Sequence, residues 1–183
     1  MPANSANPAL GTVQSPLIVA GVDMRAAVCD CAKSVTYKQV DKIPVDDWVK
    51  CCILGRKRQT CVEEKIEEAQ KDKGAGDEKI NAPAGAQYQS THLPPGQKYC
   101  LPDFVVGTGT KPLPAAQITK IYELKNPCNK EGEPLPSIAD WNPKKLMGGT
   151  MAACYKHAHL KGGKPKPGGI TVEAIGPTAE SCP

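Results

Sequence analysis

Three side chains in the middle of the chain have the types and spacing that metal-assisted cleavage of phosphodiesters requires. Asp103 follows Pro102 at the start of one β-rich run, and Glu123 and Lys125 stand at the end of the next, about twenty residues later. Carboxylates hold hard divalent cations, which activate water and stabilise charge on a phosphate. Strand residues two apart point to the same face, so Glu123 and Lys125 would face the site and Leu124 the packed side. The rival interpretation is an exposed ion pair on a hairpin.

Elements on both sides of these residues would have to position them. Apolar residues at helical spacing predict a helix over residues 46–54, ended by Gly55. The capping box Thr60-Cys-Val-Glu63 predicts a second helix over residues 61–73. Strands are expected at 104–106, 118–124 and 170–175, with a weak one at 87–93. A further helix is expected from Pro143 to about Ala158, although Gly148-Gly149 weakens it.

The motif and the order of these elements resemble the PD-(D/E)xK nuclease superfamily. The resemblance covers about residues 60–175 and rests on Pro102-Asp103, Glu123 and Lys125. It implies an α/β fold with a restriction-endonuclease-like αβββαβ core, in which helices flank a mixed central sheet. Residues 59–183 would form the nuclease domain, and residues 1–58 a tail with a Cys-rich helical extension.

The resemblance also implies a site and a cofactor. Asp103 and Glu123 would hold Mg²⁺ or Mn²⁺ together with the backbone carbonyl of Leu124, and Lys125 would act on the water or the phosphate. Many members of this superfamily add a glutamate from the first core helix, and Glu67 is the candidate that we favour among the four glutamates there. A solvated helix face is the alternative for each of them.

Residues 142–169 carry six lysines and no acidic residue. In the family that this chain resembles, the helix in this segment lies beside the active site, where cations would neutralise phosphates without reading sequence. The alternative is an ordinary solvated basic helix, and Tyr155 could equally belong to the packing. The substrate-binding candidates are Lys144, Lys145, Tyr155, Lys156 and His157.

Composition sets the compartment and the class of protein. The chain has 183 residues and a net charge of +4. Its nine cysteines are a high proportion for this length, which is typical of proteins in oxidising compartments. The sequence shows no signal peptide and no apolar run long enough to span a bilayer. Among the members of the superfamily, a short Cys-rich chain most resembles the bacterial toxins. These toxins are delivered into a target cell as secreted effectors. DNA would then be the favoured substrate, with RNA as an alternative, and an acidic immunity protein would be the partner.

Two other hypotheses remain open. The chain could be a disulfide-stabilised secreted binding or structural module in which Asp103 and Glu123 are incidental. Structural zinc is a weaker rival, because Cys29-x-Cys31 and Cys51-Cys52 lack the spacing of zinc knuckles. If the strands that carry Asp103 and Glu123 are antiparallel neighbours, Cys100 falls opposite residues 126–128. This register predicts a disulfide between Cys100 and Cys128.

Overall fold

The computed structural model describes residues 14–82 and 87–183. Its centre is a four-stranded mixed sheet in the order β3-β4-β5-β6. These strands are Glu78–Asn81, Phe104–Thr108, Ile118–Leu124 and Thr171–Ile175. The first three strands are antiparallel, and β6 is parallel to β5. The mixed α/β class that the sequence predicts is therefore confirmed.

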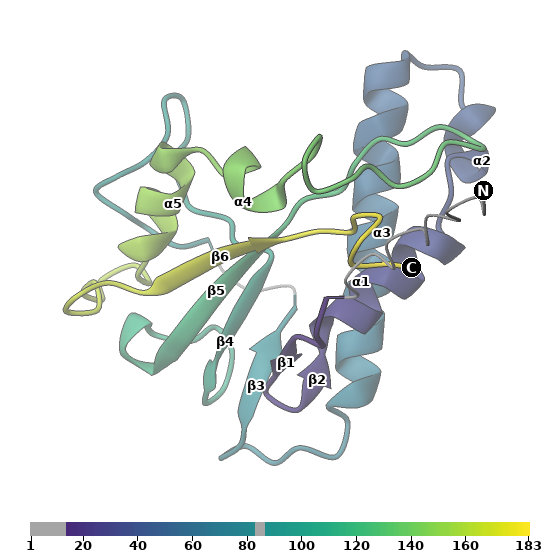
Figure 1. Cartoon of the computed structure of the whole chain (residues 1–183). Helices are drawn as coiled ribbons and strands as arrows, with labels where there is room; N and C mark the ends of the chain where they lie inside the picture. Colours follow the sequence, from purple (N-terminus) through teal and green to yellow (C-terminus); the bar gives the residue numbers. More distant parts are fainter. Residues whose placement is uncertain (1–13, 83–86) are drawn as a thin grey trace, which may run out of the picture.

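Helices cover both faces of this sheet, with α3 on one side and α5 on the other (Figure 1). Helix α1 (Met24–Ser34) packs beside α3 (Asp47–Ala69), and a short hairpin of β1 (Ile18–Val19) and β2 (Val22–Asp23) leads into α1. On the other side is α5 (Gly149–Lys156), and α4 (Pro143–Leu146) lies at the edge strand β6. The single turn α2 (Lys38–Asp41) joins α1 to α3, and a 3-10 turn (Ala115–Gln117) precedes β5. None of the helices in the described ranges is long and apolar enough to cross a membrane.

Alternation along the strands gives the sheet two separate cores. On one face, the strands pack against α3 and α1 in a first apolar cluster. Its members are Phe104 and Val106 of β4, Tyr122 and Leu124 of β5, Val62 and Ile66 of α3, and Met24 and Val28 of α1. Val105 and Ile121 face the other way, towards Cys154, Tyr155 and Ala158. Glu123 follows this second set, so it extends from the α5 side of the sheet.

Helix α3 corrects the expectation of two helices separated at Gly55. It is one continuous helix, because a glycine inside a helix costs only about 1 kcal/mol and tertiary contacts hold this turn in place. The side chain of Asn126 donates to the Gly55 carbonyl oxygen at 3.3 Å. The predicted helix start with a capping box at Thr60 is also wrong. The Glu63 carboxylate instead accepts a hydrogen bond from the side-chain amide of Gln59 at 3.0 Å. A domain boundary at residue 58 would fall inside this helix.

Three further elements differ from expectation. Residues 87–93 form no strand; Tyr88 and Gln89 make isolated bridges to Cys100 and His159. The first strand of the sheet is β3, whose exposed edge is completed by Gln70. The Gln70 side chain accepts from the Ile80 N–H at 2.6 Å and donates to the Ile80 carbonyl at 2.9 Å, as a neighbouring strand would. The helix expected after Pro143 is divided into α4 and α5 at Met147-Gly148.

Four disulfides link the helices to one another, to the segments that flank β4 and β5, and to the C-terminal tail. They are Cys29–Cys182, Cys31–Cys61, Cys51–Cys128 and Cys100–Cys154. The predicted Cys100–Cys128 pair is therefore wrong. Its register was close, since Phe104 pairs with Tyr122, but the chain leaves the ladder beyond Asp103. Cys100 pairs with Tyr88 in a bridge and faces α5, whereas Cys128 turns back to α3.

Candidate functional site

Asp103 and Glu123 meet at the end of the sheet where β4 begins and β5 ends. The ladder from Phe104–Tyr122 to Val106–Lys120 places Asp103 directly opposite Glu123. The Asp103 carboxylate accepts from the backbone N–H of Leu124 at 2.7 Å. Both carboxylates line a pocket of about 380 Å³ that opens beside α3. The expectation that the strands carrying Asp103 and Glu123 are antiparallel neighbours is therefore confirmed.

Lys125 and Leu124 have the alternation that the sequence predicts. Lys125 Nζ lies 3.0 Å from Glu123 Oε1, so the ammonium and the carboxylate share one face of the strand. Leu124 is buried in the opposite cluster, against α1 and α3. Helix α5 approaches the same face, because Lys125 Nζ is 3.9 Å from Met151 Sδ.

Tyr155 is a buried part of this site rather than an exposed substrate contact. Its ring is 4% exposed, and its hydroxyl lies 2.9 Å from Glu123 Oε2 and 3.1 Å from the Leu101 carbonyl oxygen. A hydroxyl has one proton, and donation to the charged carboxylate is the stronger interaction. Burial, followed by the charge of Glu123, raises the pKa of Tyr155. The phenol therefore stays protonated and holds Glu123 in place from the α5 side.

Burial raises the pKa of Asp103 to about 7, and the neighbouring Glu123 carboxylate adds to the effect. Two carboxylates held together in a desolvated position repel each other when both are ionised. A divalent cation would relieve this repulsion, which is the electrostatic character of a metal site. When both carboxylates are ionised, the ammonium of Lys125 compensates only one of the two negative charges, so the pair stays electrostatically strained.

This strain predicts that Asp103→Asn stabilises the metal-free protein at alkaline pH. An acid whose pKa is raised on folding binds more protons in the folded state, so its contribution to stability is lost as pH rises from about 4 to 7. Asparagine carries no charge and keeps an acceptor for the Leu124 N–H. Melting temperatures in EDTA should favour Asp103→Asn increasingly from pH 5 to pH 8, whereas Asp72→Asn, at an exposed position, should show no such trend. A variant less stable than the parent at pH 8 would contradict this electrostatic account.

The other predicted residues are more scattered. Glu67 is exposed and lines a different hollow, with Gln70, Lys79 and Asn81. Within residues 14–82 and 87–183, no group of three or more His, Cys, Asp or Glu side chains could hold a metal ion. The protein ligands at this site would thus be Asp103, Glu123 and the Leu124 carbonyl. In a strand the N–H and C=O of one residue point to the same side, so this carbonyl is directed towards Asp103.

None of the basic candidates lines the pocket at Asp103. Lys145 and Lys156 are exposed on α4 and at the end of α5. The His157 ring stacks on His92, with their centroids 4.5 Å apart. Lys144 is drawn towards β6, where its Nζ is 3.6 Å from Glu173.

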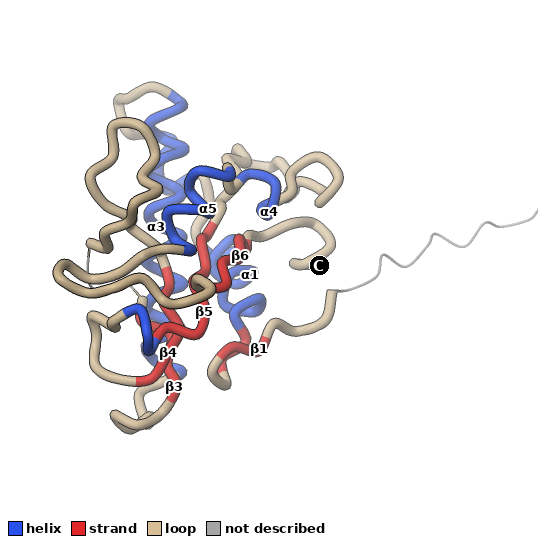
Figure 2. The backbone as a smooth tube through the Cα atoms, turned by 90° about the vertical axis from the view of Figure 1, so that its left-hand side faces the viewer, coloured by secondary structure: helices blue, strands red, loops and turns tan. Residues whose placement is uncertain are grey.

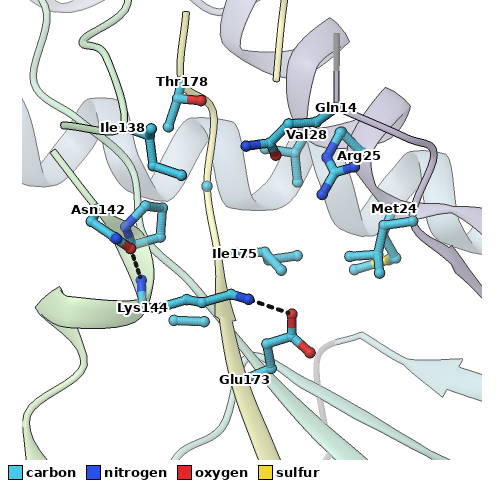
Figure 3. Close-up of a pocket in the computed structure, with 14 residues that line it drawn as sticks. Gln14, Met24, Arg25, Val28, Ile138, Asn142, Lys144, Glu173, Ile175 and Thr178 are labelled. Carbon is cyan, nitrogen blue, oxygen red and sulfur yellow. Dashed lines mark hydrogen bonds and ion pairs between the residues drawn. The ribbon is translucent and has the colours of Figure 1, made fainter. Parts of the chain in front are cut away.

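Lys144 and Glu173 belong to a second cavity, of about 340 Å³, between α1, α4 and β6. Figure 3 shows the ion pair across this cavity and the Asn142 side chain accepting from the backbone N–H of Lys144. Glu173 also pairs with Lys120 at 2.6 Å, so the single carboxylate here is already neutralised. This cavity therefore lacks the paired carboxylates of the site at Asp103.

Helix α3 supplies pocket residues that the sequence analysis missed. Trp48, Cys52, Gly55 and Gln59 line the pocket together with Asn126. Their spacing of three to four residues is that of one helix face, but the expected break at Gly55 concealed it. Trp48 and Cys52 are both exposed, although their apolar character at helical spacing is typical of a packed helix face.

No protein-family model matches this chain, and no curated protein or solved structure gives a significant match. The function proposed for this chain therefore rests on its own geometry.

Proposed function

We propose that the chain is a divalent-metal-dependent nuclease that hydrolyses phosphodiester bonds, with Asp103, Glu123 and Lys125 as its catalytic residues. The observation that carries the proposal is the meeting of two carboxylates and one ammonium at the end of adjacent antiparallel strands. The order helix, three antiparallel strands, helix and a parallel strand supports a restriction-endonuclease-like core. The pocket opens this site to a substrate.

The donor set fits Mg²⁺ or Mn²⁺, which prefer oxygen ligands and keep several waters. Asp103, Glu123 and the carbonyl of Leu124 would hold the ion, and the remaining positions would be open to water and phosphate. When bound, such an ion supplies a Lewis acid and lowers the pKa of water. The repulsion between the two carboxylates is the feature of this structure that an ion would compensate.

The side chains around the carboxylates have separable roles. Tyr155 holds Glu123 through its hydroxyl, and the Leu124 N–H holds Asp103. Lys125 pairs with Glu123 in the free protein and would turn to a phosphate oxygen or the attacking water once an ion neutralises that carboxylate. A cation aimed at the charge that develops in the transition state is a strong catalytic device.

The biological setting that we propose is antibacterial. Four disulfides are typical of proteins from oxidising compartments, which suits a secreted toxin. A toxin that cleaves nucleic acid requires an inhibitor in the cell that makes it, and an acidic protein would complement the exposed Lys144, Lys145 and Lys156.

Digestion assays test the nuclease directly. Purified oxidised protein is incubated with plasmid DNA and with RNA in Mg²⁺, Mn²⁺ or EDTA, and the products are resolved on gels. We expect cleavage of DNA that requires the ion. Binding of an ion without cleavage of either polymer would favour the alternative, a disulfide-stabilised binding module, which the four disulfides also suit.

A further inference from the structure

The pocket at Asp103 has an aromatic wall that the proposed chemistry does not use. Trp48 lies in the first turns of α3 and is 76% exposed, the highest value among the large apolar side chains of the described residues. It lines the same pocket as Asp103 and Glu123. An exposed large aromatic ring beside polar catalytic groups is a feature of ligand sites.

The position of Trp48 is fixed relative to the catalytic strand. Cys51, three residues after Trp48 in α3, is bonded to Cys128, which lies three residues after Lys125; the two Cα atoms are 5.2 Å apart. One turn further along α3, the Asn126 side chain donates to the Gly55 carbonyl. Two independent links therefore hold this part of the helix against the end of β5. Figure 2 shows the first part of α3 extending beyond the ends of the strands.

We propose that Trp48 forms a base-binding subsite, in which an unpaired nucleobase next to the scissile phosphate stacks on the indole ring. The inference rests on the proposed nuclease function and names the form of its substrate: a single strand, or a strand unpaired at the cleavage point. An indole stacks on any base without reading sequence. A base inside a duplex has both faces covered by its neighbours, so it reaches Trp48 only when it is unstacked.

The geometry accounts for the other pocket residues as well. A base on Trp48 would place its backbone towards Asp103, Glu123 and Lys125, since all line or border one pocket of about 380 Å³. This volume is within the range of roughly 300–1,000 Å³ that is usual for small-ligand sites. Cys52, one turn from Trp48, is the free cysteine among nine and is exposed. A bound strand would cover its thiol.

Tryptophan fluorescence reports the contact without requiring cleavage. The chain has two tryptophans, so Trp141→Phe leaves Trp48 as the only indole. Titration in EDTA with a short single-stranded oligonucleotide should quench its emission saturably, and a blunt duplex of the same sequence should quench it much less. The same oligonucleotide should slow the alkylation of Cys52. Absence of saturable quenching, or equal quenching by the duplex, would overturn the proposal.

Substitution separates the subsite from the chemistry. Trp48→Ala should weaken single-strand binding about 5- to 150-fold, the range expected from loss of one stacked base, and raise KM while kcat changes by less than about threefold. Trp48→Phe keeps a ring and should retain most of the affinity. Ile18→Ala, at another exposed apolar position that does not line this pocket, should behave as the parent.

The outcomes distinguish this proposal from the nuclease itself. If the parent cleaves nucleic acid and Trp48→Ala binds and cleaves equally well, the subsite is wrong and the nuclease stands. If the oligonucleotide quenches Trp48 and protects Cys52 but no ion supports cleavage, the base-binding subsite stands and the nuclease fails.

Discussion

Asp103→Ala should reduce nuclease activity by about a thousandfold or more while leaving the fold intact. Asp103 shares the ion with Glu123, so its loss removes several kcal/mol of charge stabilisation from the transition state, at roughly 1.4 kcal/mol per tenfold in rate. Its side chain is only partly buried and contributes to neither apolar cluster. Titration calorimetry should show that Mg²⁺ or Mn²⁺ binding is lost as well.

Lys125→Ala is the matched comparison, because it removes charge without removing a ligand. We expect a loss of about 10²–10³ in kcat with binding of the ion retained or tightened, since Glu123 is released from its ion pair. Equal loss of ion binding in the two variants would show that Lys125 acts on the site as a structural group instead.

Arg58→Met should cause the largest loss of stability of any single change outside the cores. The Arg58 side chain is 1% exposed and its pKa is lowered to about 10 by burial. Its guanidinium donates to four acceptors at 2.9–3.4 Å: the carbonyl oxygens of Ala32, Val35 and Pro127 and the side chain of Asn129. It thereby joins the end of α1, α3 and the segment after β5.

Methionine replaces only the aliphatic part of this side chain and leaves the acceptors unpaired, at about 1–3 kcal/mol for each one that stays buried. We expect a total loss of about 3–5 kcal/mol in urea unfolding of the oxidised protein. Arg56→Met, on the exposed side of the same helix, should change stability by less than about 0.5 kcal/mol. An Arg58→Met variant as stable as the parent would mean that the guanidinium hydrogen bonds are worth no more than the cost of burying the charge.

Local patterns predicted the centre of the fold well and its borders poorly. The β-rich runs before Thr108 and Leu124 are long, apolar and bounded by turn residues, so both strands, their pairing and the meeting of Asp103 with Glu123 could be derived. The four residues of β3 could not, because they lie in a segment rich in Gly and Asp, and the side chain of Gln70, just after α3, stabilises their edge. Secondary-structure propensities describe local sequence and do not include such a tertiary contact.

The prediction of the helical side of the site failed for a related reason. Gly55 and the Thr60–Glu63 pattern are local stop and start signals, but two disulfides and the buried Arg58 hold α3 as one helix through both. Only a continuous helix places Trp48, Cys52 and Gln59 on the face that lines the pocket. The pairing of Cys100 with Cys154 also depends on the path of the chain before β4, where Cys100 bridges to Tyr88, and the register of the strands did not specify this path.

Plasmid and single-strand digestion by two matched glutamate variants tests the central claim most directly. Glu123 and Glu173 lie on the adjacent parallel strands β5 and β6, and each pairs with a lysine at 2.6–3.0 Å. Only Glu123 lines the pocket with Asp103. In Mg²⁺, with folding checked by circular dichroism, Glu123→Ala should lose activity by about a thousandfold, whereas Glu173→Ala should stay within about threefold of the parent. Cleavage by Glu123→Ala at the parental rate would show that Asp103 and Glu123 are not the site of a nuclease.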